Sequence, residues 1–256
     1  MVHNPFSGKV NESEVQAHGA STVAAEARFA EEAECAFREF VMQQEFPCVG
    51  ARAAFNSESY LLRVYDQLGA AASTQALARD LFEFTRSDIR HASEYATFVA
   101  VFAGPDGDDE ARFEQRLWQQ LGALNRADAE HFEYDSTVQS DPADPQFSFS
   151  FAGQALYVIG MHPGSSRMAR RFRWPTLVFN PHEQFERLRA DGKWKRMQQT
   201  IRERDLELQG SVNPMLSDFG QRTEARQYSG RAVEENWRAP FTAAKPRAEG
   251  KCPFGH

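Results

Sequence analysis

The sequence has few cysteines, no long apolar run and no excess of positive charge, and each absence excludes a class of protein. No stretch approaches the roughly 20 apolar residues that a membrane-spanning helix needs, and residues 1–8 lack the charged segment followed by an apolar one that marks a signal peptide. The three cysteines, Cys35, Cys48 and Cys252, form a sparse and uneven set that does not fit a disulfide framework. We therefore expect a cytoplasmic protein with no membrane partner.

Basic side chains are in the minority, which argues against a nucleic-acid partner. The chain of 256 residues carries 29 Lys and Arg against 36 Asp and Glu, a formal net charge of -7. A net negative chain repels phosphate backbones. The hydrophobic fraction of 41% and the charged fraction of 25% are typical of a globular protein. A chain of this length buries enough surface to fold without disulfides or structural metals.

The common catalytic motifs are also missing. The sequence has no glycine-rich dinucleotide fingerprint after a strand, no phosphate-binding loop and no nucleophile elbow. It has neither an H-E-x-x-H motif nor paired C-x-x-C motifs, which argues against a structural zinc site. What it has in quantity is phenylalanine, with 21 residues against 6 Tyr and 4 Trp. Such a set either fills a core or lines an apolar pocket for a flat cofactor, and the count does not separate the two.

Hydrophobic periodicity gives a coarse secondary structure. Ser21 and Thr22 are the N-caps expected for a first helix, which runs to Val41, and Pro47 and Gly50 mark a break after it. Residues 60–68 fit either a helix or a strand. We expect further helices over residues 74–84, 110–132, 182–189 and 194–206, and strands over residues 95–102, 147–151, 155–161 and 176–179.

The strands predict the fold class. Residues 147–151 and 155–161 flank Gly153, which is typical of a hairpin, and a hairpin argues against a purely parallel sheet. With four or five strands in all, we expect an α+β fold: a single domain with a small mixed or antiparallel sheet flanked by helices. We place this domain at residues 21–242, between a flexible N-terminus over residues 1–20 and a flexible tail over residues 243–256.

A dense polar stretch follows the second strand of the hairpin. Arginine forks suit carboxylate or phosphate groups because each donates two hydrogen bonds at once. The stretch is therefore either an anion site or an ordinary turn with solvated arginines. Its residues are His162, Ser165 and Ser166 in the turn, followed by Arg167, Arg170 and Arg171.

Further polar residues occur near the C-terminal end of the domain, in residues 209–214 and 223–230. Glu224 is a candidate for recognising a cation, and Tyr228 for a hydrogen bond to a ligand. The alternative is that both segments are capped turns, for which glycine and asparagine are well suited.

One other residue is a candidate for chemistry. Cys48 lies in Phe-Pro-Cys-Val-Gly, where a broken backbone either holds a thiolate toward a metal or simply buries a small thiol. Cys35 falls inside the first helix and suits packing. His182, after Asn-Pro, suits the first residue of a helix.

Taken together, these stretches resemble the YqcI/YcgG family. Its members include haem-dependent N-hydroxylases of guanidine compounds, as in guanitoxin and cycloserine biosynthesis. The resemblance extends from about Phe46 to Trp237 with matching order and spacing. The matching segments are FPCVGARAAF at residues 46–55, YATFVAVFAGP at 95–105, FEQRLWQQLGAL at 113–124, DPADPQFSFSFAGQALYVIGMHPGSSRMARRF at 141–172, RWPTLVFNPHEQFERLR at 173–189, IRERDLELQGSVNPMLSDFG at 201–220 and TEARQYSGR at 223–231.

The resemblance implies haem b, that is iron protoporphyrin IX, as cofactor. A thiolate ligand favours oxygenase chemistry, so Cys48 is the first candidate for the iron and His162 the rival. The chain departs from the family pattern near its end, where Trp237-Arg238-Ala239-Pro240-Phe241 replaces the expected Trp-x-Cys-Pro-Phe. Cys-Pro-Phe occurs only later, at Cys252, which leaves Cys48 as the better thiolate.

The resemblance also implies an activity: N-hydroxylation of a guanidine or amine small molecule that resembles arginine, with electrons from an external donor. Arg167, Arg170 and Arg171 are then candidates for the haem propionates. Glu224 and Asn213 are candidates for the substrate. Ser165, Ser166 and Tyr228 are candidates for donating to bound oxygen or relaying protons.

Two other functions stay open at this point. One is a haem protein without catalysis, either a sensor or a carrier. The other is a haem-free enzyme that uses His162 and the arginines on an anionic small molecule. The oligomeric state is open, since no heptad pattern forces one.

Overall fold

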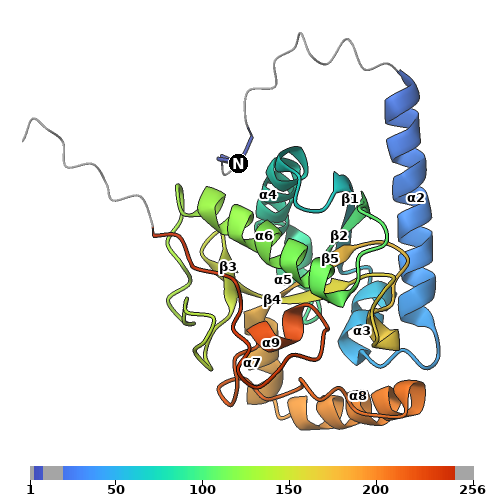
Figure 1. Cartoon of the computed structure of the whole chain (residues 1–256), viewed down its shortest axis with the longest axis vertical. Helices are drawn as coiled ribbons and strands as arrows, with labels where there is room; N and C mark the ends of the chain where they lie inside the picture. The colour runs from blue at the N-terminus through green and yellow to red at the C-terminus, as the bar shows by residue number, and fades with distance from the viewer. Residues whose placement is uncertain (1–2, 8–19, 246–256) are drawn as a thin grey trace, which may run out of the picture.

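The computed structural model describes residues 3–7 and 20–245 of the chain (Figure 1). Most of the N-terminus expected to be flexible lies outside the described residues. So do residues 246–256 of the expected tail, including Cys252.

A five-stranded mixed sheet forms the centre of the molecule (Figure 1). Its spatial order is β1-β2-β5-β4-β3; β1 and β2 pair in parallel and all other neighbours are antiparallel. The expected α+β class with one mixed sheet flanked by helices is therefore confirmed. The strands are β1 (Tyr60–Gln67), β2 (Thr97–Gly104), β3 (Phe149–Phe151), β4 (Gln154–Met161) and β5 (Thr176–Pro181).

The helices cover both faces and one end of this sheet. They are α2 (Ala20–Met42), α3 (Val49–Asn56), α4 (Ala71–Thr85), α5 (Asp88–Ala92), α6 (Glu110–Asp128), η1 (Met168–Arg170), α7 (His182–Ala190), α8 (Trp194–Gln209) and α9 (Ala225–Tyr228). Each of the long expected helices is present, although α6 ends at Asp128 rather than near Phe132. The ambiguous residues 60–68 are mostly strand, as β1.

The helix α3 lies where the sequence predicted only a break. Pro47 precedes the helix, and Cys48 takes an extended conformation (φ -76°, ψ 103°) as its N-cap. Its thiol accepts a hydrogen bond from the backbone N–H of Ala51, which stands in for the usual serine or aspartate cap. Gly50 falls in the first turn of the helix rather than ending it.

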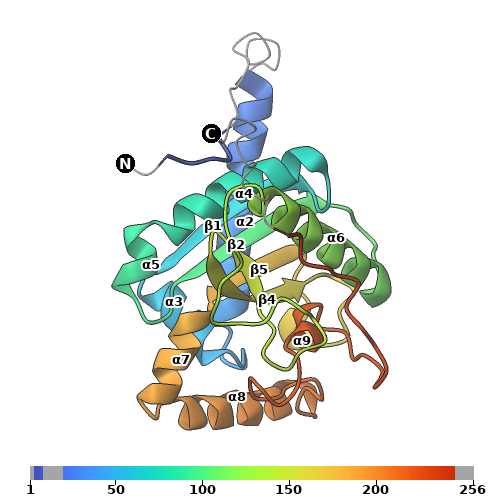
Figure 2. The same ribbon diagram turned by 90° about the vertical axis from the view of Figure 1, so that its left-hand side faces the viewer.

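Helices α4 and α6 cover one face of the sheet (Figure 2). Side chains alternate along each strand, so Phe98 and Phe102 of β2 and Phe179 of β5 share this face and are fully buried. Gly160 of β4 also faces it. A Cβ at Gly160 would lie 2.7 Å from side-chain atoms of Phe113 and Leu117 and 2.9 Å from a backbone oxygen of Tyr228, so the bare backbone admits α6 closely.

Helices α2 and α3 cover the opposite face, and α8 lies across its end (Figures 1 and 2). Val99 of β2 and Val178 of β5 meet Phe37 of α2 and Phe55 of α3 there. The cover is thinner at α8, whose only buried residue is Asp205.

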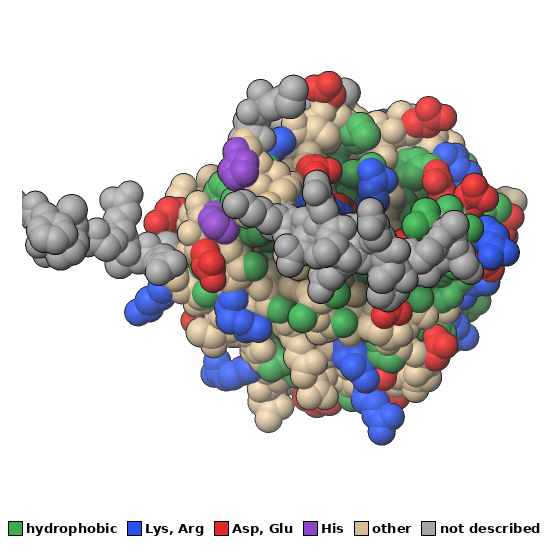
Figure 3. All heavy atoms as spheres, turned by 90° about the horizontal axis from the view of Figure 1, so that it is seen from above, with side chains coloured by type: hydrophobic (Ala, Val, Ile, Leu, Met, Phe, Trp, Pro, Cys, Tyr) green, Lys and Arg blue, Asp and Glu red, His purple; other side chains and the backbone are tan. Residues whose placement is uncertain are grey.

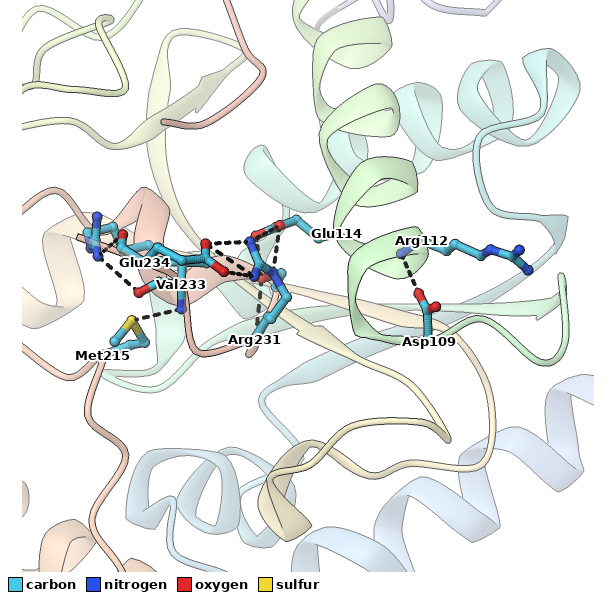
Figure 4. A network of polar contacts seen from close by, with 9 residues as sticks. Asp109, Arg112, Glu114, Met215, Arg231, Val233 and Glu234 are labelled. Atoms are coloured by element: carbon cyan, nitrogen blue, oxygen red, sulfur yellow. Dashed lines mark hydrogen bonds and ion pairs between the residues drawn. The ribbon is translucent and has the colours of Figure 1, made fainter. Parts of the chain in front are cut away.

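An ion network holds the segment after α9 against α6 (Figure 4). Arg231 donates from Nε to Glu114 of α6 at 2.9 Å and from Nη1 to Glu234 at 3.1 Å, and Ser229 also donates to Glu114, at 3.1 Å. The backbone N–H of Val233 meets the sulfur of Met215 at 3.5 Å. These contacts fix the position of α9, which follows directly on Glu224.

The outer surface carries charges of both signs. Seen from above, acidic and basic side chains are interspersed with apolar ones (Figure 3). In the part of the chain that the structure describes, no helix has the length and apolar character to cross a membrane.

Candidate functional site

A cavity of about 230 Å³ lies between the α2/α3 face of the sheet and the helices α7 and α8. Its floor is the sheet itself. Val99 of β2 pairs with Val178 of β5, and Val178 pairs in turn with Ile159 of β4, so the three side chains form one row. Tyr157 and Asn180 form the next pair in register and extend the floor toward α7. Alternate side chains of the same strands therefore fill the core on the α4/α6 face and form the floor of a cavity on the α2/α3 face.

Cys48 lies in the wall of this cavity at the N-terminus of α3. Burial raises the pKa of the Cys48 thiol, while the backbone N–H groups of Ala51 and Gly50 and the charge of Arg170 act to lower it. The N-terminus of a helix favours negative charge. The site thus offers a thiol with partial support for its thiolate, beside apolar wall residues such as Phe46 and Phe55.

Glu224 lies in the same wall and is 5% exposed. Its Oε1 accepts a hydrogen bond of 2.7 Å from the hydroxyl of Tyr228. Within the described residues no Lys, Arg or His forms an ion pair with it. Burial raises the pKa of Glu224 to about 7. A buried carboxyl of this kind gains most from a ligand that brings a positive charge.

Aromatic rings connect the floor of the cavity to its outer wall. The ring centroids of Tyr157 and Phe185 are 5.7 Å apart, and those of Phe185 and Trp194 are 5.9 Å apart. The rings of His182 and Phe219 lie 4.5 Å apart. All five residues line the cavity. Such a wall excludes water and attracts cations through its ring faces.

Two of the three arginines predicted from the sequence reach the cavity wall, and both already have partners. Arg167 forms an ion pair of 2.6 Å with Asp205 and donates to the Ser211 carbonyl at 2.8 Å. Arg170 donates only to main-chain carbonyls, those of Gly160 at 3.0 Å, Gln227 at 3.2 Å and Tyr228 at 3.4 Å. No carboxylate of the described residues forms an ion pair with Arg170, so its charge is free to attract an anion. Burial lowers the pKa of Arg170.

The remaining residues of the polar stretch lie away from the cavity wall. Arg171 donates to the Ser165 carbonyl at 2.8 Å, and the Ser166 hydroxyl donates to Glu110 at 2.7 Å. His162 is 1% exposed and stacks on Phe113 of α6 at 4.2 Å. Neither of its ring nitrogens has a hydrogen-bond partner among the described residues. Burial lowers the pKa of His162.

Asn213 and Tyr228, the other predicted residues, differ in their access to the cavity. Asn213 lines it; its backbone N–H donates to Asp205 at 2.7 Å and its Oδ1 accepts from Met215 at 3.0 Å. Tyr228 is fully buried behind the wall, where its hydroxyl donates to Glu224 and its carbonyl accepts from Arg170.

The sequence analysis missed several residues of the wall. Asn180 and His182 flank the proline that ends the buried strand β5, and Trp194 opens an otherwise polar helix. Polar residues at the end of a buried strand were the signal that pointed to His162, and the same signal applied here. His182 is 5% exposed and Gln184 is 5% exposed, and both line the cavity.

Among residues 3–7 and 20–245 no group of three or more His, Cys, Asp or Glu could hold a metal ion. A haem iron needs only one or two protein ligands, so this finding does not bear on haem.

The YqcI/YcgG family model matches residues 37–242. The chain belongs to the YqcI/YcgG family. The matched region begins within α2 and runs past α9, so it contains every residue that lines the cavity of this YqcI/YcgG protein. Comparison with curated proteins and with solved structures gave no significant match.

Proposed function

We propose that this YqcI/YcgG protein is a haem-dependent oxygenase that N-hydroxylates a small guanidine or amine similar to arginine. The observation that supports it best is the shared cavity of Cys48 and Glu224. One is a thiol at a helix N-terminus and the other a buried carboxyl without a cation partner among the described residues. An iron ligand and a binding group for a cationic substrate are the two things that such an enzyme needs.

The residues of the cavity fit a haem in their chemistry. Cys48 offers an axial thiolate, and phenylalanine and valine side chains offer apolar walls. Arg170, with no carboxylate partner among the described residues, suits a propionate better than Arg167, which is paired with Asp205. His162 lies outside the wall, which favours Cys48 over it as the iron ligand.

The volume of the cavity limits what it can hold without a change in shape. About 230 Å³ is below the roughly 300–1,000 Å³ of pockets that enclose drug-sized ligands. A macrocycle therefore requires the wall to move outward. Among the α-helices of the wall, α8 has the fewest buried residues, with only Asp205 buried, so we assign the movement to α8.

Bound haem would supply the activation of dioxygen, and an external donor the electrons. The protein's own groups bind and orient the substrate. A cationic ligand near Glu224 lowers the pKa of that carboxyl from about 7 and holds it ionised, while the Tyr228 hydroxyl fixes Oε1. Tyr157 donates to Gln227 at 2.8 Å, which keeps its ring in the aromatic wall that excludes water.

The ligand assignment is tested by absorption spectroscopy of the full-length protein produced with a haem precursor, reduced and exposed to CO. We expect a Soret band and a strongly red-shifted ferrous–CO band, and the loss of that red shift in Cys48→Ala. Cys35→Ala is the matched control, because Cys35 is exposed on α2. A CO band at the imidazole position would move the ligand to a histidine. The absence of any Soret band from folded protein would refute the haem proposal.

The substrate assignment is tested with Glu224→Gln, which keeps the shape of the side chain and removes its charge. We expect N-hydroxylation of guanidine substrates to fall by about 100-fold or more, since a buried charge pair is lost. Asp128→Asn is the control, because Asp128 is another buried carboxyl with a pKa raised to about 7 but lies outside the cavity wall. Haem binding without turnover in the wild-type protein would favour a sensor or carrier instead.

A further inference from the structure

The cavity wall contains polar atoms that the protein itself leaves without partners. The Nε2 of His182, the Nε1 of Trp194 and the Oε1 of Gln184 are all buried and form no hydrogen bond among the described residues. An unpartnered buried polar atom costs about 1–3 kcal/mol. Unpartnered buried atoms also occur elsewhere in the described residues, but these three lie in the wall of one cavity, where a ligand could complete their hydrogen bonds.

Arg189 brings a positive charge to this part of the cavity wall. The guanidinium carbon of Arg189 is 5.0 Å from the ring centroid of Trp194 and 5.7 Å from that of Phe219. The Phe219 ring is in turn 4.5 Å from the ring of His182. Arg189 also lines the cavity, and its charge acts on both His182 and Glu224.

The charge of Arg189 is only partly neutralised by the protein. Its Nη1 forms an ion pair with Glu186, whose side chain is 51% exposed, and pairs of this kind contribute about 0–1 kcal/mol. Among the described residues its Nε and Nη2 have no hydrogen-bond partner.

These groups have a common chemistry, because the guanidinium of Arg189 and the indole N–H of Trp194 only donate hydrogen bonds. A neutral histidine donates through one of its nitrogens, and burial lowers the pKa of His182 so that the neutral form dominates near pH 7. A set of donors that includes a cation suits a carboxylate. Gln184 adds an acceptor to the same wall, which suits an amine carried beside that carboxylate.

We propose that Arg189, Trp194 and His182 form a carboxylate subsite, so that the cavity takes a ligand carrying both a carboxylate and a cation. The assignment rests on the proposed function for the cation, which Glu224 binds. It makes Arg189 and Trp194 specificity-determining residues that separate free amino acids from the amines formed by removing the carboxylate.

The test is equilibrium binding by calorimetry to the full-length protein as purified. The probes are L-arginine, agmatine, which lacks the carboxylate, and L-citrulline, which lacks the cation. We expect L-arginine to bind about tenfold or more tighter than agmatine, the worth of one charge-assisted hydrogen bond. In Arg189→Gln this ratio should fall to about one, and in Trp194→Phe by a few-fold. Arg187→Gln should keep the wild-type ratio, because Arg187 lies on the same helix but outside the wall.

The binding results distinguish failure of the carboxylate subsite from failure of the proposed function. Equal affinities for L-arginine and agmatine in the wild-type protein, no binding of either amino acid, or the same response in the Arg189 and Arg187 variants would overturn the carboxylate subsite. Failure of the proposed function has a different signature. The arginine-to-agmatine ratio would then depend on Arg189 as expected, while L-citrulline would bind as tightly as L-arginine and Glu224→Gln would change neither.

Discussion

The two faces of the sheet use the same strands for opposite purposes. On the α4/α6 face, Phe98, Phe102 and Phe179 are fully buried and Gly160 lets α6 approach the backbone. On the α2/α3 face, Val99 and Val178 form the floor of a cavity. Since neighbouring residues of a strand point to opposite faces, each strand supplies one row to a close-packed core and one row to the site.

The difference shows where this protein tolerates incomplete packing. Among the described residues, unpartnered buried atoms of His182, Gln184 and Trp194 lie in the cavity wall. Unpartnered ring nitrogens of His162 and Trp118 also occur on the α6 side, but outside that wall. On the packed side, Asp128 is 2% exposed but its Oδ1 accepts from the Ala152 N–H at 2.7 Å. The first face therefore forms the close-packed core, and the second places unpartnered polar atoms where a ligand could reach them.

The largest difference between the faces should come from removing one phenylalanine from each. Phe179→Ala, on the packed face, should lower the free energy of unfolding by about 3–5 kcal/mol. Phe185→Ala, in the partly exposed cavity wall, should lower it by about 1–2 kcal/mol, because the space it leaves joins an existing cavity. Denaturant unfolding measures both. Equal losses would show that the cavity face is packed as tightly as the other.

The two buried carboxyls, one on each side of the sheet, should both make the stability of the protein depend on pH. Burial raises the pKa of Asp128 from 3.8 and that of Glu224 from 4.5, each to about 7. Folding therefore favours their protonated forms, and their contribution to stability is full below about pH 4 and is lost as the pH rises through about 7. We expect each to account for roughly 3 kcal/mol of this fall, which Asp128→Asn and Glu224→Gln should each remove in part.

A guanidine ligand should act on only one of these two carboxyls. It should remove the share of the pH dependence that belongs to Glu224 and leave the share of Asp128, because only Glu224 lines the cavity. Unfolding measured from pH 4 to 8 with and without ligand checks this. A ligand that changed the slope equally in wild type and Glu224→Gln would contradict it.

A pair of glycines should respond in opposite directions. Gly160→Ala puts a methyl group 2.7 Å from Phe113 and Leu117, which should destabilise the protein by about 1–3 kcal/mol. Gly50→Ala, in α3 beside the cavity, meets only the Tyr95 ring at 3.5 Å and should stabilise by up to about 1 kcal/mol. Thermal unfolding of the two variants and the wild-type protein measures both changes in stability. Stabilisation by Gly160→Ala would show that α6 can withdraw from the sheet.

The smallest effect expected is a difference in hydrogen exchange between two helices. α6 buries residues on every turn, among them Phe113, Leu117 and Leu121, whereas α8 buries only Asp205. Amide hydrogens of α8 should exchange faster, and a ligand that fills the cavity should slow them while leaving α6 unchanged. Equal protection in the two helices would remove α8 as the movable wall.

Much of the fold could be predicted from local patterns. The apolar stripe of α6, the continuous apolar run of β2 and the glycine between β3 and β4 were all visible in the sequence. The helix α3 was not, because Pro47 and Gly50 are typical of a break and cysteine is an unusual N-cap. The type of β1 depends on its pairing with β2, which local periodicity does not contain.

The candidate site could be predicted in part. Cys48, Arg167, Arg170, Asn213 and Glu224 come from distant segments and meet at one cavity. His162 does not, and strand parity explains why. Tyr157, Ile159 and Met161 face the cavity, so the even-numbered His162 continues toward α6. The roles proposed for Ser165, Ser166 and Arg171 stay predictions, and none of the three lies in the wall.

The position of β5 in the sheet determines when the sheet can form during synthesis of the chain. It is the last strand of the described residues, yet it lies between β2 and β4. During synthesis β2 and the β3–β4 hairpin are therefore made first and stay apart until β5 emerges and joins them. Arg189, Trp194 and Glu224 follow later still, so a growing chain has a folding scaffold well before it has a place for a ligand. A nascent chain of this design cannot bind a ligand in the complete cavity until Glu224 has left the ribosome.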